Sequence, residues 1–134
     1  MQKTLYLIRG LPGSGKTELA YRIADRCVAA DDFRYNDRGE YIFDPKMNGT
    51  VHSQCLAQVA RWMKEKDDCS PIAVHNTFST REEAKPYFVL AKQHGWTVNV
   101  ITTTNNFHNV HNVPEETIVG MAKRWQEFSG GEPC

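Results

Sequence analysis

The chain has 134 residues, of which 40% are hydrophobic and 24% are charged, and its formal net charge at pH 7 is zero. This length suffices for one small domain with a buried core, so we expect residues 1–134 to form a single domain. The balanced charge excludes the broad basic surface of a strong non-specific nucleic-acid binder, although it permits a local basic patch.

The first predicted element is a strand over residues 4–9, an apolar run rich in strand-forming side chains. Residues 10–17 follow and read Gly-Leu-Pro-Gly-Ser-Gly-Lys-Thr, which fits the phosphate-binding pattern G-x-x-x-x-G-K-S/T. A helix is predicted over residues 18–26. Strand, loop and helix in this order are the setting that the motif requires, so a chance match explains the sequence poorly.

The residue types of this loop suit a nucleoside triphosphate. The glycines let the backbone turn tightly and present N–H groups to anionic oxygens, and the following helix adds its N-terminal dipole. Lys16 brings a positive charge to the outer phosphates, and Thr17 offers a hydroxyl to Mg²⁺. The predicted nucleotide-binding residues are Gly10, Leu11, Pro12, Gly13, Ser14, Gly15, Lys16 and Thr17.

The rest of the chain alternates strand and helix signals. We predict strands over residues 27–30, 71–74 and 96–103, and helices over residues 49–66, 86–94 and 114–128. Residues 35–47 are rich in turn formers, and residues 105–113 form a polar loop. Ser79 with Glu82, or Thr80 with Glu83, resembles a helix-capping pair. Pro86 is expected to break the third helix, and Gly95 to end it.

Strands separated by helices imply a parallel sheet with helices on both faces, which binds its ligand at the carboxyl ends of the strands. The phosphate loop, Asp31-Asp32 and His75-Asn76 each follow a predicted strand, so they are expected to converge on one crevice. Asp31 can accept a proton from an attacking hydroxyl, and Arg34 can hold a phosphate through its planar fork of donors. Alternatively, the two aspartates cap a turn and Arg34 is solvated.

Several motifs together resemble the polynucleotide-kinase-like branch of the P-loop kinases, over nearly the whole chain. They are the phosphate loop, Ala-Asp-Asp-Phe-Arg at 30–34, Gly-Glu-Tyr at 39–41, Phe-Asp-Pro at 43–45, His-Asn-Thr at 75–77, Lys-Pro-Tyr at 85–87 and Asn-Val-His-Asn-Val-Pro-Glu-Glu at 109–116. The resemblance implies a three-layer α/β sandwich with a small parallel sheet flanked by helices. It also implies ATP and Mg²⁺ as cofactors, Asp31 as the general base and Arg34 as the contact for an acceptor phosphate.

The chain differs from this family in two places. His75 stands where many relatives have an aspartate that orients magnesium-bound water. The lid segment, residues 102–111, has neither Lys nor Arg, and a missing lid arginine can lower the rate on the order of 10³-fold. His108 and His111 replace such a charge only when protonated, and they equally fit an ordinary surface role in the lid.

The remaining candidate residues have two interpretations each. Arg38 is a further candidate for an acceptor phosphate. His75 and Asn76 either touch the substrate or are structural, and the same two interpretations apply to His52 near the second helix. Tyr35 and Tyr41 can stack on a base or anchor their loop. Trp62 and Trp125 fall on apolar stripes and are expected in the core.

The sequence thus predicts an ATP-dependent kinase in which Asp31 deprotonates an acceptor hydroxyl. By resemblance the acceptor is nucleic acid, either a polynucleotide 5′-hydroxyl or a hydroxymethyl group of a modified pyrimidine in phage DNA. A nucleoside or other small-molecule hydroxyl is the alternative, and a nucleotide-binding module with little turnover is another. The four cysteines lack C-x-x-C spacing, and the first apolar run is too short for a signal peptide or membrane span. We therefore expect a cytoplasmic protein, in the host cytoplasm if it is phage-encoded, with no membrane partner.

Overall fold

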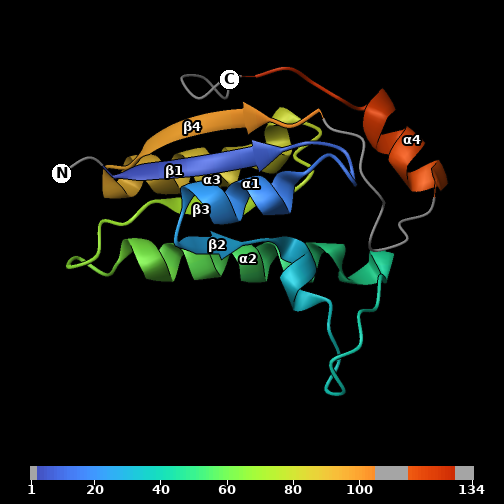
Figure 1. The fold of residues 1–134 in the computed structure, drawn as a ribbon, viewed down its shortest axis with the longest axis horizontal. Helices are drawn as coiled ribbons and strands as arrows, with labels where there is room; N and C mark the ends of the chain where they lie inside the picture. Colours follow the sequence, from blue (N-terminus) through green and yellow to red (C-terminus); the bar gives the residue numbers. More distant parts are fainter. Residues whose placement is uncertain (1–2, 105–114, 129–134) are drawn as a thin grey trace.

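The computed structural model describes residues 3–104 and 115–128. Within them, four parallel strands form one sheet in the order β2-β3-β1-β4 (Figure 1). The strands are β1 (Thr4–Arg9), β2 (Arg26–Val28), β3 (Ile72–His75) and β4 (Thr97–Thr102). The predicted parallel sheet is confirmed, and β1, which leads into the phosphate loop, lies between β3 and β4.

Helices cover both faces of this sheet. The helices are α1 (Lys16–Ile23), α2 (Asn48–Met63), α3 (Arg81–His94) and α4 (Glu115–Lys123), with short 3-10 turns η1 (Ala30–Phe33) and η2 (Pro45–Met47). On one face Ala20 of α1 packs with Ile8 and Ala73 of the sheet. The larger core lies on the other face, where apolar side chains of β1, β3, α2 and α3 meet. The three-layer α/β sandwich is therefore confirmed.

The first helix is shorter than predicted. It ends at Ile23, and Arg26 begins β2 instead of ending the helix. The guanidinium of Arg26 donates to the carbonyl of Ser70 at 2.6 Å and lies over the ring of Trp62, which packs against the core as expected. These contacts come from distant parts of the chain, so local helical spacing did not indicate them. Because β2 ends at Val28, Asp31 lies on η1 rather than directly after the strand.

The third helix is continuous from Arg81 to His94, so the predicted break at Pro86 is wrong. Thr80 caps the helix by accepting from the backbone N–H of Glu83, and Gly95 ends it in the left-handed conformation at φ 76°. Pro86 lies in the second turn on the exposed side. There it removes a single helical hydrogen bond, whose carbonyl water can satisfy.

The last helix ends at Lys123, so the predicted extension to residue 128 is wrong. Trp125 and Phe128 follow it in a non-helical segment that packs against Arg9. Figure 1 shows α4 at the edge of the molecule where the strands end. The predicted polar loop with His108 and His111 lies outside the described residues. Among the helices that are described, none has the length and apolar character needed to cross a membrane.

Candidate active site

A cavity of about 580 Å³ opens at the carboxyl edge of the sheet. The phosphate loop, η1, the loop after β3, the start of α2 and the inner side of α4 contribute to its walls. Its charged or titratable lining residues are Lys16, Glu18, Asp31, Arg34, His52, His75, Glu83 and Arg124. The sheet topology therefore brings the phosphate loop, Asp31 and His75 together, as the sequence predicts.

The phosphate loop has the backbone conformation that its glycines allow. Gly15 caps α1 at φ 95° and Gly13 has φ 84°, both in the region that side chains other than glycine rarely occupy. Ser14 is buried, and its hydroxyl pairs at 2.6 Å with that of Thr103, just after β4. The loop is thereby tied to the neighbouring strand. The first turn of α1 lines the cavity, and the N-terminus of a helix favours bound anions.

Lys16 lies within this loop as the sequence predicts. Its Nζ donates to the carbonyls of Gly10 and Leu11 at 2.9 and 3.1 Å. Burial lowers the pKa of Lys16 to about 8, and the nearby carboxylate of Asp31 opposes that shift. A bound polyphosphate would add negative charge next to Nζ and favour the protonated form.

Thr17 and His75 form a pair across the cavity floor. The Thr17 hydroxyl lies 3.3 Å from Nδ1 of His75, whose other ring nitrogen is buried without a partner in the described part of the chain. Burial lowers the pKa of His75, so the ring is neutral at physiological pH and can accept the hydroxyl proton. His75 thus lies next to the first turn of α1, within hydrogen-bond distance of the Thr17 hydroxyl.

The donor set fits a magnesium ion that arrives with a nucleotide. Within residues 3–104 and 115–128, no three acidic, histidine or cysteine side chains form a group able to hold a metal. Mg²⁺ needs no such group, because it keeps several waters and takes oxygens from phosphates. The exposed hydroxyl of Thr17, which lines the cavity, is the group predicted to hold such an ion.

Asp31 and Arg34 form an ion pair at the cavity wall. Oδ1 of Asp31 accepts from Nε of Arg34 at 2.7 Å and from the hydroxyl of Tyr41 at 3.3 Å. The Arg34 side chain is only 5% exposed, whereas that of Asp31 is 43% exposed. Arg34 also donates to Asn48, and its remaining Nη1 has no hydrogen-bond partner among the described residues. The pair therefore presents an accessible carboxylate beside a buried guanidinium with one spare donor.

Two neighbouring residues hold Asp31 in place. The carboxylate of Asp32 accepts the backbone N–H of Ala29 at 2.9 Å, which caps the η1 turn. The buried side chain of Asn76 accepts the N–H of Ala30 at 2.8 Å. Asn76 therefore links the end of β3 to the backbone next to Asp31, in addition to lining the cavity.

The other predicted residues differ in whether they line the cavity. Arg38 is in an exposed turn, where its N–H donates to the side chain of Asn36, and it does not line the cavity. Tyr35 and Tyr41 pack edge to face at the base of that turn, and Tyr35 is half exposed. His52 does line the cavity, from α2. The substrate roles predicted for Arg38, His75 and Asn76 remain predictions.

Sequence reasoning missed two arginines. Arg9, the last residue of β1, is completely buried, and Arg124, just after α4, lines the cavity. The signal for Arg9 was a charge at the end of an apolar strand. Arg124 carried no local signal, because nothing in its own stretch of sequence shows that α4 lines the same cavity as the phosphate loop.

The chain has sequence relatives among known proteins. No family model matches the chain. NEDD4-binding protein 2 of Homo sapiens is 33% identical over 138 residues, a match that spans 92% of this chain and 8% of that protein. This chain thus corresponds to a small part of that relative.

Solved structures share the fold at low sequence identity. A chain of the Pnkp1/Rnl/Hen1 complex superposes with a TM-score of 0.60 at 20% identity, covering 89% of this chain and 38% of that one. A gluconokinase from Sinorhizobium meliloti 1021 gives a TM-score of 0.58 at 11% identity, covering 92% of this chain and 75% of that one. The chain therefore shares the α/β fold of these two structures.

Proposed function

We propose that this protein is an ATP-dependent kinase that transfers the terminal phosphoryl group to a hydroxyl. The observation that carries the proposal is that Lys16 and Asp31 line one cavity. Lys16 begins the helix that follows β1, and Asp31 lies on the η1 turn that follows β2. Lys16 is the cation for the outer phosphates of the donor. Asp31, with its accessible carboxylate, is the base for the acceptor.

In the proposed reaction, the acceptor oxygen attacks the γ-phosphorus in line and forms a new P–O bond. The bond from that phosphorus to the β,γ-bridging oxygen breaks, and ADP leaves with the electron pair. The acceptor proton passes to the Asp31 carboxylate. Mg²⁺, held on the protein side by Thr17, neutralises charge on the phosphates when it is bound.

Arg34 has two roles in this proposal. Through Nε it holds Asp31 in one rotamer, because the 2.7 Å contact fixes the carboxylate relative to a buried side chain. Its Nη1 has no partner among the described residues but is shielded from solvent, so it would donate to an acceptor phosphate only after the side chains around it move. The guanidinium also lies 4.9 Å over the ring of Phe43, which keeps its plane fixed.

The proposed acceptor is a hydroxyl of nucleic acid, either a polynucleotide 5′-hydroxyl or a hydroxymethyl group of a modified pyrimidine. Its support is the resemblance to polynucleotide-kinase-like enzymes and the place of Arg34 on the cavity wall beside Asp31. The zero net charge favours a second candidate, a kinase of a nucleoside or other small hydroxyl compound.

The test is transfer of labelled γ-phosphate from ATP to a panel of acceptors. The panel contains oligonucleotides with and without 5′-hydroxyl ends, DNA with hydroxymethylated pyrimidines, free nucleosides and sugars. Asp31→Asn is the matched inactive control. Labelling of only a nucleoside or sugar at low salt would replace the nucleic-acid proposal by the second candidate, and labelling of nothing would contradict the kinase proposal.

A further inference from the structure

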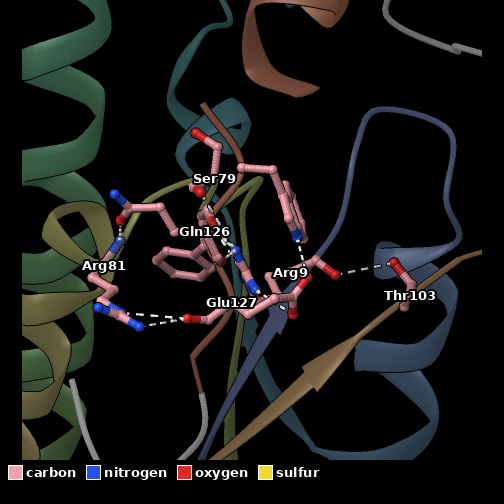
Figure 2. A network of polar contacts seen from close by, with 8 residues as sticks. Arg9, Ser79, Arg81, Thr103, Gln126 and Glu127 are labelled. Atoms are coloured by element: carbon pink, nitrogen blue, oxygen red, sulfur yellow. Dashed lines mark hydrogen bonds and ion pairs between the residues drawn. The ribbon is translucent and has the colours of Figure 1, made fainter. Parts of the chain in front are cut away.

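The fully buried guanidinium of Arg9 joins three segments of the chain next to the phosphate loop (Figure 2). It donates to the carbonyl of Phe78, after β3, at 2.8 and 3.0 Å, and to the carbonyl of Gln126, after α4, at 2.6 Å. Its plane lies 3.9 Å from the ring of Trp125 and 4.0 Å from that of Phe128. A buried charge with this many partners is a strong anchor.

The segment of residues 125–128 is held from its other side as well. The N–H of Gln126 donates to the carbonyl of Ser79 at 2.7 Å, and its side-chain oxygen accepts the N–H of Arg81 at 2.8 Å. The side chain of Arg81 donates to the carbonyl of Glu127. We call residues 125–128 the strap. Since the strap is bound to Arg9 of β1 and to the start of α3, the chain that follows α4 is held at the end of β1 (Figure 2).

The loop after β3 depends on the same anchor. Phe78 is buried with φ 46°, a conformation that a bulky side chain adopts only at a cost of about 1–3 kcal/mol. Both hydrogen bonds from Arg9 to its carbonyl stabilise that conformation. Phe78 and Thr77 line the cavity, so Arg9 organises the cavity wall on two sides.

Arg124 directly precedes the strap and faces the cavity. Thr117, Met121 and Arg124 all line it, and their spacing of four and three residues puts them on one side of α4. The Arg124 guanidinium lies back along the helix, with Nη1 3.4 Å from the position a Cβ on Gly120 would take. Its side chain makes no hydrogen bond or ion pair within the described residues.

The cavity otherwise offers little free positive charge. Arg34 is already paired with Asp31 and Asn48, which leaves Lys16 from the loop. A nucleoside triphosphate brings several negative charges, and its terminal phosphate gains more charge on leaving the bridging oxygen. A second cation close to that phosphate would stabilise this charge. The lid segment cannot supply it, because residues 102–111 include no Lys or Arg.

We propose that Arg124 contacts the terminal phosphate of the bound triphosphate, and that Arg9 positions it through the strap. The inference rests on the proposed function for the identity of the ligand. Arg124 is then a catalytic residue, because it touches the transferred group, and Arg9 is a positioning residue that acts from the far side of the strap.

The first test measures binding of Mg²⁺-ATP and Mg²⁺-ADP by calorimetry, independently of turnover. Arg124→Gln is expected to weaken ATP binding about tenfold and to leave ADP binding unchanged, because only ATP has the terminal phosphate. Lys123→Gln, which removes a neighbouring exposed charge that does not line the cavity, is the matched control and should change neither. Equal losses for both nucleotides, no loss, or a raised acceptor KM alone would overturn the proposal.

The second test asks whether Arg9 acts through Arg124. Arg9→Lys keeps the charge but cannot make all the hydrogen bonds, so it is expected to lower the ATP-over-ADP preference severalfold. In the Arg124→Gln background the same change should have no further effect on that preference. If Arg9→Lys fails to fold, Phe128→Leu is used in its place, because it removes one of the two aromatic rings that pack on the Arg9 guanidinium. A full additional loss of preference in the double variant would contradict the coupling.

These outcomes separate the inference from the proposed function. If Arg124→Gln selectively weakens ATP binding while no hydroxyl acceptor is labelled, the kinase proposal fails and the contact stands. If phosphate transfer occurs and Arg124→Gln leaves both the ATP preference and kcat unchanged, the contact is refuted and the kinase proposal stands.

Discussion

Gly10, the first residue of the phosphate loop, has no room for a side chain. A Cβ there would overlap Oγ of Ser14 and Oγ1 of Thr103, and it would lie 3.0 Å from the carbonyl oxygen of Thr103. Two of these atoms form the 2.6 Å hydrogen bond that ties the loop to the end of β4. Gly10→Ala must therefore move the loop away from the strand or break this hydrogen bond.

The expected cost combines two effects. Overpacking of a tight site costs about 1–3 kcal/mol, and loss of a part-buried hydrogen bond costs about 1 kcal/mol. We predict that Gly10→Ala lowers the free energy of unfolding by about 2–4 kcal/mol. With an unfolding entropy of about 2.1 cal/mol/K per residue, this corresponds to a fall in Tm of about 7–14 °C.

Urea denaturation, with the m-value checked for constancy, measures this change. Gly49→Ala is the matched control: a Cβ at Gly49, the second residue of α2, has nothing within 4 Å, so the change should leave stability unchanged or raise it by at most about 0.5–1 kcal/mol. Removing both hydroxyls, with Ser14→Ala and Thr103→Ala, should recover part of the loss in Gly10→Ala. Equal stability of the Gly10→Ala protein and the wild type would refute the steric argument.

The remaining predictions concern the chemistry of the cavity. Lys16→Ala should abolish phosphate transfer in a folded protein, and wild-type turnover by that variant would remove the role assigned to the phosphate loop. Because burial lowers the pKa of Lys16 to about 8, ATP affinity should be nearly constant below pH 8 and fall by up to about tenfold per pH unit above it, as Nζ loses its proton. Calorimetry from pH 7 to 10 checks this, and Lys16→Ala should show no such decline. Asp31→Asn should lose most of the single-turnover rate while ATP still binds, whereas Asp32→Asn should be mild, because an amide oxygen can still accept the N–H of Ala29. The reverse order would place the base one residue further on. Arg34→Ala should lower kcat/KM for the acceptor with the ATP KM nearly unchanged. A donor panel should show that ATP is used and GTP tolerated to some degree, and strict GTP dependence would contradict this.

Much of the fold follows from short stretches of the sequence. The phosphate loop can be recognised from the sequence because its conformation depends on glycines at fixed local spacing. Gly13 and Gly15 have positive φ, as expected. Strands and helices alternate with a clear change of period, which implies a parallel sheet and a common edge for the ligand. The convergence of Lys16, Asp31 and His75 on one cavity followed from that topology alone.

Other features depend on residues that are far apart in the chain. Arg9 is a buried anchor because it reaches carbonyls 69 and 117 residues away, and no local pattern contains those partners. Asn76 supports Asp31 through a hydrogen bond that spans 46 residues. Local rules also failed at Pro86, where a good cap and a buried helix face outweigh one lost hydrogen bond.

The sequence alone therefore predicted the class of ligand and the residues that would meet its phosphates, because these predictions depend on residue types at fixed short spacing. Only the tertiary structure decided which charges are free to act. In the structure, Arg34 is buried beside Asp31 and Arg9 is buried against the strap. Arg124 is exposed and lines the cavity. The availability of a charge depends on its burial and partners, and those arise from contacts between segments that the sequence places far apart.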